Sequence, residues 1–347
     1  MRMFTLLVTM MIALSPMAEA SAMQPRDSAP SHDATMRQGS GRSFGVYQGN
    51  GCDGVKRLGS YVSWLGRDPD FVLDFFASDS WQSMQGDASW TVKCWAKQQR
   101  KVVFSVPMLI NSKEVSLADG AAGKYDDQFT QLAQLLVANG YGDAIIRLGW
   151  EFNGGWYPWA AKKDPENWVK YWQRIVTTMR NVQGSAFRFD WCSAQGYLQI
   201  PADKVYPGDD YVDIIGRDTY NQTWASNANT PEQRWNDLLT QPYGLNWLAE
   251  FARKHNKPIS IPEWATGTRP DGHGGGDDGF FIERMAQWMD QNNVIYHSYW
   301  DYPAKDYNGK LSDGSKPQAG QALLQAFGGR GEKNLDRGDK DQRRGAP

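Results

Sequence analysis

Short apolar runs alternate with amphipathic segments along most of the chain. The apolar runs are typical of buried strands, whereas the segments between them favour helices. Strands that alternate with helices pair in parallel, because a parallel pair needs a long crossover connection. The predicted strands span residues 44–47, 71–76, 102–108, 144–148, 187–191, 212–215, 258–262 and 294–300.

The clearest predicted helices span residues 128–137, 165–179, 245–255 and 278–291. Asp164 and Pro165 predict a helix start, since they supply an N-cap followed by proline in the first turn. Eight strand–helix units are the number found in the TIM barrel. We therefore predict an α/β fold, a single (β/α)8 TIM barrel that spans residues 43–327.

The two ends of the chain have a different composition. Residues 1–22 resemble a signal peptide, with Arg2, an apolar run and A-x-A sites that end at Ala20 and Ala22. The apolar run is too short to span a bilayer, so we expect cleavage and a secreted or periplasmic protein. Residues 23–42 are expected to be a flexible lead-in and residues 328–347 a disordered charged tail.

Composition and charge narrow the class of partner. The 347 residues carry a formal net charge of −2, which argues against nucleic acid or an anionic membrane surface as partner. The 16 tryptophans point to aromatic surfaces that serve a ligand, although barrel cores also use tryptophan. No Cys/His pattern has metal-ligand spacing, so we expect no metal and no cofactor. We expect a monomer.

Three cysteines remain for a compartment in which disulfides can form. Cys52 and Cys94 fall in the first two helix or loop regions, which are neighbours in a barrel, so we predict that they pair. Cys192 directly follows an apolar strand and is predicted to be a buried thiol.

Two glutamates carry the candidate chemistry. Glu151 follows the fourth predicted strand and Glu263 ends the seventh, so in a ring of eight their tips face each other across the mouth. Such a pair suits cleavage of a glycosidic bond, in which one acid protonates the leaving oxygen and the other attacks carbon or activates water. A charged Glu263 is expected to raise the pKa of Glu151 and keep it protonated.

Other residues near the strand ends are candidates for binding. Tyr220 could donate a hydrogen bond to the predicted nucleophile, and Asp301 could bind a sugar hydroxyl. Asp218 has either a role in the site or a salt bridge with Arg217. Residues 273–278 could hold a metal, but a mobile loop before a helix capped by Asp277 or Asp278 is favoured.

Several of these residues carry a resemblance to a known family. Arg147, Glu151, Asn153-Gly154 and Trp156-Tyr157-Pro158-Trp159 look like the acid/base motif of glycoside hydrolase family 26. This clan A family is typified by endo-β-1,4-mannanases. Val46-Tyr47-Gln48-Gly49 resembles its first strand, and Pro262-Glu263 falls where its nucleophile does. The resemblance covers residues 43–327 and is most specific around Glu151.

The resemblance implies a retaining mechanism, with Glu151 as acid/base and Glu263 as nucleophile. It also implies that Arg147 and Tyr220 support the site through hydrogen bonds, and that Trp156 and Trp300 are platforms for sugar rings. The remaining candidate substrate-binding residues are Trp150, Asn153, Trp159 and Trp264.

The residue before the acid/base is usually histidine in the family's mannanases, whereas here it is Trp150. The resemblance therefore implies a secreted endo-β-glycanase whose first candidate substrate is mannan. A xylan, a β-glucan and a bacterial exopolysaccharide are the alternative substrates. An alternative of another class is a non-catalytic carbohydrate-binding barrel, in which the aromatic residues bind sugar and the acids have other roles.

Overall fold

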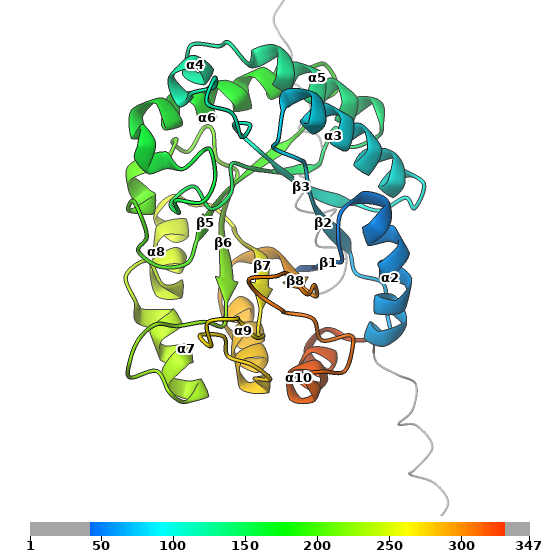
Figure 1. Cartoon of the computed structure of the whole chain (residues 1–347), viewed down its shortest axis with the longest axis vertical. Coiled ribbons are helices and arrows are strands. Elements are labelled where there is room, and N and C mark those ends of the chain that lie inside the picture. Colours follow the sequence, from blue (N-terminus) through cyan, green and yellow to red (C-terminus); the bar gives the residue numbers. More distant parts are fainter. Residues whose placement is uncertain (1–41, 330–347) are drawn as a thin grey trace, which may run out of the picture.

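Eight parallel strands close into a barrel in the order β1 to β8 (Figure 1). The computed structural model describes residues 42–329, so the predicted signal peptide and nearly all of the lead-in and tail lie outside the described residues. The predicted (β/α)8 barrel is confirmed. The strands are β1 (Ser43–Tyr47), β2 (Phe71–Phe75), β3 (Val102–Val106), β4 (Ile145–Leu148), β5 (Arg188–Ala194), β6 (Ile214–Tyr220), β7 (Ile259–Ala265) and β8 (Val294–Trp300).

Three strands extend further toward their carboxyl ends than the apolar runs indicate. The fifth run ends at residue 191, the sixth at 215 and the seventh at 262, whereas β5, β6 and β7 continue to Ala194, Tyr220 and Ala265. The added residues include polar and charged side chains near the barrel mouth. Apolar patterning misses such residues, because it detects only strand positions that lie in the core.

Helices surround the barrel on all sides (Figure 1). The predicted start of α6 is confirmed, since the Asp164 side chain accepts a hydrogen bond from the Asn167 backbone at 3.3 Å. Asp278 caps α9 in the same way, accepting from the Phe281 backbone at 3.0 Å. The helices are α2 (Gly51–Leu65), α3 (Trp81–Ala96), α4 (Leu117–Ala121), α5 (Asp126–Ala138), α6 (Pro165–Arg180), α7 (Pro231–Thr240), α8 (Leu245–Lys254), α9 (Gly279–Gln291) and α10 (Pro317–Phe327), with short 3-10 turns η1 (Ala161–Lys163) and η2 (Ala202–Val205).

The apolar core has two layers. A small inner cluster fills the barrel, and a much larger cluster lies between the strands and the helices. Several of the tryptophans belong to the outer layer and are fully buried, so part of the tryptophan content serves packing. The inner cluster comprises Tyr47, Phe71, Leu73, Val103, Ile145, Ile214, Ile295 and Tyr296.

A disulfide joins the first two helices. Cys52 in α2 and Cys94 in α3 are bonded, with their Cα atoms 5.1 Å apart, and Cys192 is a buried free thiol. Both predictions for the cysteines are confirmed. Adjacent strand–helix units bring their helices together, which explains why residues separated by 42 positions can bond.

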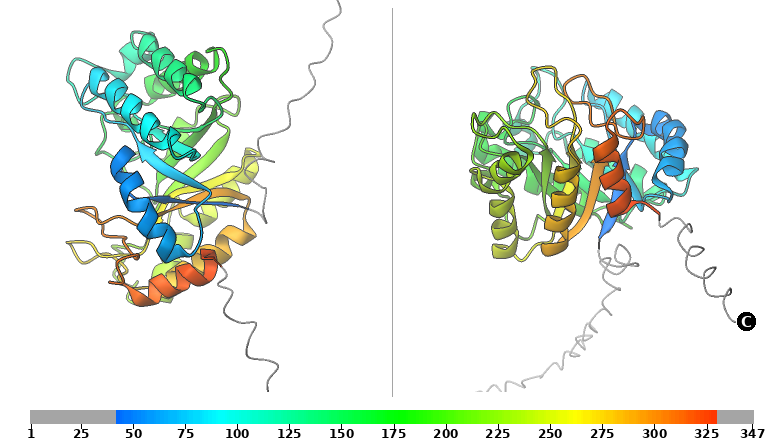
Figure 2. Two further views of the ribbon diagram at one scale, coloured as in Figure 1. Left: turned by 90° about the vertical axis from the view of Figure 1, so that its right-hand side faces the viewer. Right: turned by 90° about the horizontal axis from the view of Figure 1, so that it is seen from below.

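The long loops gather at one end of the barrel. Figure 2 shows the loops that follow β7 and β8, in yellow and orange, projecting from the end at which the strands finish. The described chain starts at the opposite end, where β1 begins. Within residues 42–329, no helix has both the length and the apolar content needed to cross a bilayer.

Candidate active site

Glu151 lies in a tight turn directly after β4. The backbone of this turn is left-handed at Gly149, with φ 51°, and at Glu151 itself, with φ 53°. A Cβ atom at position 149 would lie only 2.4 Å from the Met108 sulfur, so the turn needs glycine there. For Glu151 the left-handed conformation costs on the order of 1 kcal/mol. Its N–H donates to the Cys192 carbonyl on β5 at 2.8 Å, which fixes the turn in place.

Glu263 lies on β7, whose register with both neighbouring strands shifts around this position. Such irregularities redirect the side chains beside them. The Tyr220 hydroxyl donates to Oε2 of Glu263 at 2.6 Å, and Nη2 of Arg147 lies 2.6 Å from Oε1. The predicted hydrogen bond from Tyr220 is therefore present. With a donor on each oxygen, the Glu263 carboxylate is oriented before substrate binds.

Arg147 connects the two halves of the site from below. Its side chain is fully buried on β4, donates to the Ser105 hydroxyl at 3.0 Å and pairs with both Asp218 and Glu263. Burial disfavours the charge, but the two carboxylates raise the pKa of Arg147 above its ordinary value. A buried cation persists only when it is paired in this way. The guanidinium therefore forms an ion pair with the predicted nucleophile, Glu263.

The Glu151 carboxyl is held in its protonated form. Its Oε2 accepts a hydrogen bond from the Trp156 indole at 2.8 Å. Burial, and then the negative charge of Glu263, raise the pKa of Glu151 from 4.5 to about 8, against the opposing charge of Arg147. Glu263 thus acts in the predicted direction, but burial is the larger cause. At neutral pH Glu151 carries the proton that a general acid donates.

Asp218 pairs across the barrel mouth with Arg147, and no bond to the adjacent Arg217 is present. The Cys192 thiol donates to Asp218 Oδ1 at 3.4 Å, and burial raises the pKa of Asp218 above its ordinary value. Arg217 instead donates to the Tyr243 carbonyl. Successive residues of a strand point to opposite faces, so a pair between neighbours was excluded once both lay on β6.

Three predicted site residues support the loop after β4 and do not line the cleft: Trp150, Asn153 and Trp159. Asn153 clamps the end of β5, accepting from the Ala194 N–H at 2.8 Å and donating to its carbonyl at 3.0 Å. The Trp159 indole donates to the Trp150 carbonyl at 2.8 Å, and the Trp150 indole donates to the Tyr157 hydroxyl at 2.9 Å. Of the residues that they contact, Tyr157 and Ala194 line the cleft. Trp150 is therefore connected to the cleft through its hydrogen bond to Tyr157.

A cleft of about 870 Å³ opens over the two glutamates. Its walls come from the loops after β4 to β8 and from α7. Six of the predicted site residues line it: Glu151, Trp156, Asp218, Tyr220, Glu263 and Trp300.

Besides Arg147, Trp150, Asn153 and Trp159, two further predicted substrate-binding residues do not line the cleft. Trp264 is fully buried between the barrel and the helices, where its indole donates to His297 at 3.1 Å and its ring packs near Phe281. Its position next to Glu263 on a strand sends it to the opposite face.

Asp301 does not line the cleft either. Its carboxylate accepts from the Gln48 side chain at 2.8 Å, from the Ser312 hydroxyl at 2.6 Å and from the Leu311 N–H at 2.6 Å. These donors already occupy the acceptor capacity that a sugar hydroxyl would use. In this structure Asp301 fastens the loop after β8 to the end of β1.

Several cleft residues carried no signal in the strand pattern. They follow the same strand ends as the predicted residues but lie deeper in the loops, where no periodicity marks them. For some of them, a position shortly after a strand end was the feature of the sequence that could have identified them. They are Tyr157, Gln195, Tyr197, Gln222, Trp224, Arg269, Asp306 and Tyr307.

The described part of the chain contains no group of three or more His, Cys, Asp or Glu side chains placed to bind a metal ion. His273 of the Gly-rich loop bonds instead through Nδ1 to the Thr223 carbonyl at 2.9 Å. The site itself presents two carboxyl groups, one with a raised pKa and one bonded to cationic and phenolic donors.

Comparison with known proteins extends this picture. The family model of glycosyl hydrolase family 26 matches residues 87–255. Over 305 residues the chain is 26% identical to "Endoglucanase H" of Acetivibrio thermocellus, an alignment that covers 78% of this chain. The chain spans only 31% of that protein's length.

Solved structures share the barrel. A modular endo-β-1,4-mannanase from Cellulomonas fimi superposes with a TM-score of 0.59 at 17% identity, over 82% of this chain and 70% of that one. The catalytic domain of a family 26 endo-β-1,4-mannanase from Bacillus sp. JAMB-750 gives 0.57 at 16% identity, over 83% and 86%. At these identities the likeness concerns the fold. Together with the family match, the comparisons confirm the predicted resemblance.

Proposed function

We propose that this chain, a glycoside hydrolase of family 26, is a retaining endo-β-glycanase in which Glu263 is the nucleophile and Glu151 the acid/base. The observation that supports this most strongly is the contrast between the two carboxyl groups. Glu263 is oriented by Tyr220 and Arg147, whereas Glu151 has a pKa of about 8 and carries a proton. One acid that carries a proton and a second that is held in place as a nucleophile are what a retaining glycosidase needs.

The first displacement uses both groups at once. A Glu263 oxygen forms a bond to the anomeric carbon as the bond between that carbon and the leaving oxygen breaks. The Glu151 proton passes to the leaving oxygen, so the departing sugar leaves as a neutral alcohol. The product on the protein is a glycosyl ester of Glu263, and Glu151 is now a carboxylate.

The second displacement reverses these roles. Once Glu263 is esterified its negative charge is gone, and with it one of the causes that raised the pKa of Glu151. Glu151 then takes a proton from water while the water oxygen bonds to the anomeric carbon and releases Glu263. Two inversions at one carbon restore the original configuration.

The proposed substrate is a mannan with β-1,4 linkages. The similar structures named above are mannanases and the similar curated protein is an endoglucanase, so a β-glucan is the second candidate. Trp150, which stands where the family's mannanases usually have histidine, is the reason to test substrates other than mannan. A xylan and a bacterial exopolysaccharide complete the panel to be tested.

We also propose that the protein acts outside the cytoplasm, as a monomer and without a cofactor. The basis is the predicted signal peptide in residues 1–22 and the chemistry of the carboxyl pair. N-terminal sequencing of the exported protein should show cleavage after Ala20 or Ala22. An exported form that retains Met1 would contradict this part of the proposal.

Proton NMR of the first-formed product tests the mechanism. A β-linked substrate should yield the β-anomer first, before mutarotation. An inverted product would overturn Glu263 as nucleophile. Binding of a polysaccharide without release of reducing sugar, in protein with both glutamates intact, would favour the alternative of a non-catalytic carbohydrate-binding barrel.

A further inference from the structure

Large exposed aromatic side chains are concentrated at the cleft. Within residues 42–329 the exposed large hydrophobic residues are Trp90, Trp156, Tyr197 and Trp224, with exposed fractions of 41%, 55%, 59% and 58%. All but Trp90 line the cleft over the two glutamates. Exposed apolar surface that gathers in one place marks a binding site more often than a structural need.

These three residues come from successive loops. Trp156 follows β4, Tyr197 follows β5 and Trp224 follows β6, so they are spread along one side of the barrel mouth. The row begins at the predicted acid, because the Trp156 indole donates to Glu151 at 2.8 Å. From there it continues through the loop after β5 to the loop after β6.

Side chains from the loop after β7 pack against the outer end of the row. Trp224 stacks near His273, with ring centres 5.1 Å apart, and the Arg269 guanidinium lies 5.2 Å from the indole centre. Arg269 also donates to the Gln222 side chain at 2.8 Å, which ties the loop after β7 to the loop after β6. The Tyr197 ring similarly lies beside the Tyr243 ring, with ring centres 5.8 Å apart.

The opposite side of the mouth is built differently. No residue from the loops after β1, β2 or β3 is among those that line the cleft. There Tyr47 stacks on Trp300 with ring centres 4.2 Å apart, and Phe75 and Tyr302 pack edge-on against Tyr47. Tyr47, Phe75 and Tyr302 therefore pack on other rings and do not line the cleft, whereas all three rings of the row line it.

We propose that Trp156, Tyr197 and Trp224 form an aromatic track that binds successive sugar rings of the leaving portion of the polysaccharide. The track lies on the leaving side because it starts at Glu151, the group that protonates the leaving oxygen. Flat apolar rings with a polar edge suit the apolar faces of pyranose rings. This inference rests on the proposed function and adds to it that substrate length beyond the cleaved bond determines efficiency.

The track predicts a dependence on chain length that short substrates do not show. Tyr197→Ala and Trp224→Ala should each lower kcat/KM on galactomannan or β-glucan by about five- to tenfold, the scale of one lost aromatic contact. Neither variant should change kcat/KM on an aryl glycoside of a short oligosaccharide, whose leaving group ends before Tyr197. Tyr197→Phe and Trp224→Tyr keep a ring and should restore most of the loss.

Trp90→Ala is the matched control, since it removes an exposed tryptophan on α3 outside the cleft. It should leave both substrates within about twofold of wild type. Binding provides a second readout that does not need turnover. In a Glu263→Ala background, affinity electrophoresis in gels containing galactomannan or β-glucan should show retardation that Tyr197→Ala and Trp224→Ala reduce and Trp90→Ala does not.

The outcomes separate the two proposals. If the protein hydrolyses a polysaccharide and the track variants leave that activity unchanged, the track alone is overturned. The same holds if the variants lower activity on the polysaccharide and on the aryl glycoside equally. Retardation that depends on Tyr197 and Trp224, without hydrolysis by the protein that retains both glutamates, overturns the enzymatic proposal and keeps the track. Neither retardation nor hydrolysis with any polymer of the panel overturns both.

Discussion

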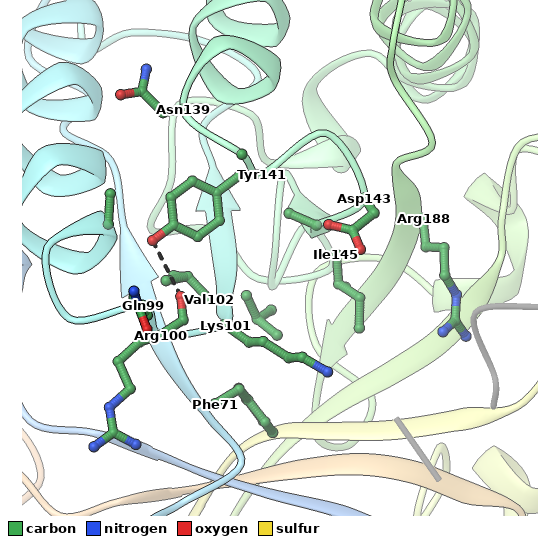
Figure 3. Close-up of a pocket in the computed structure, with 14 residues that line it drawn as sticks. Phe71, Gln99, Arg100, Lys101, Val102, Asn139, Tyr141, Asp143, Ile145 and Arg188 are labelled. Carbon is green, nitrogen blue, oxygen red and sulfur yellow. Dashed lines mark hydrogen bonds between the residues drawn. The ribbon is translucent and has the colours of Figure 1, made fainter. Parts of the chain in front are cut away.

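The two ends of the barrel each carry a hollow, one where strands begin and one where strands end. The hollow at the end where the strands begin, which we call the lower hollow, has a volume of about 350 Å³. Its lining includes the first residues of β2, β3, β4 and β5, which are Phe71, Val102, Ile145 and Arg188 (Figure 3). The cleft over the glutamates, of about 870 Å³, lies where strands finish. Barrel enzymes place their chemistry at the finishing ends and use the starting ends for stability.

The contents of the two hollows differ more than their sizes. Asp143 is the only acidic residue that lines the lower hollow, in the company of Arg100, Lys101 and Arg188. In the lower hollow, the Tyr141 hydroxyl donates a hydrogen bond to the Arg100 carbonyl at 3.2 Å, drawn as a dashed line in Figure 3. This contact joins two loops. The cleft instead holds carboxyl groups that act on each other's charge. The two hollows therefore differ in their acidic residues, and the pair that we propose to be catalytic lines the cleft.

The largest expected effect comes from the nucleophile. Glu263→Ala should lower kcat on a polysaccharide by on the order of 10⁴-fold or more, because the covalent route is lost. Asp143→Asn in the lower hollow is the matched control and should stay within about twofold of wild type. Added azide should partly restore turnover in Glu263→Ala and give an α-glycosyl azide from a β-linked substrate. A mild loss, comparable with that of Asp143→Asn, would remove the contrast between the two hollows.

Loss of the acid should be less severe and should depend on the leaving group. Glu151→Ala is expected to lower kcat/KM on a polysaccharide by about 10²–10⁴-fold, the usual contribution of general acid catalysis. On aryl glycosides with activated leaving groups the first displacement should be much less affected, and azide should yield a β-glycosyl azide. Equal loss on both substrate types would assign Glu151 a role other than proton transfer.

The pH profile of wild-type protein should report the proton on Glu151. With a pKa of about 8, the acid is competent below that pH, and kcat/KM should fall about tenfold per unit above it. The raised pKa also means that the stability which this group contributes is present below pH 4.5 and lost as the pH rises through about 8. Glu151→Gln should therefore remove this part of the decline in melting temperature with pH. An alkaline limb that is unchanged in Asp143→Asn would place the titration in the cleft.

The smallest effect is expected in the lower hollow. Tyr141→Phe loses the hydrogen bond to the Arg100 carbonyl and should lower the free energy of unfolding by about 1 kcal/mol, with no change in kcat/KM. Urea denaturation followed by tryptophan fluorescence measures the first quantity. A change in turnover without a change in stability would show that the two ends of the barrel are coupled.

The sequence supports the barrel and the proposed catalytic pair because both depend on short-range patterns. Buried strands appear as apolar runs, and the order of eight runs places Glu151 and Glu263 at facing strand ends. The alternation of strand side chains also contained the answer for Asp218 and Trp264, since each lies next to a residue that points the other way. Applying that alternation through the polar ends of β6 and β7 would have predicted both positions.

The loop aromatics could not be sorted in the same way. Trp156 and Trp159 stand three positions apart in one motif, yet Trp156 is largely exposed in the cleft and Trp159 is fully buried. Their difference depends on the path of the loop, which is set by contacts such as the bond from Trp159 to the Trp150 carbonyl. Tyr197 and Trp224 lie in loops without periodicity, so their place in the cleft depends on tertiary structure alone.

The disulfide between Cys52 and Cys94 separates heat tolerance from turnover. It closes a loop of 42 residues between the first two helices, a span for which chain entropy gives about 4 kcal/mol of stabilisation. Both cysteines belong to α2 and α3, whereas the cleft is walled by the loops after β4 to β8 and by α7. Protein produced in a reducing cytosol would therefore be active at moderate temperature but would inactivate on heating sooner than the oxidised form.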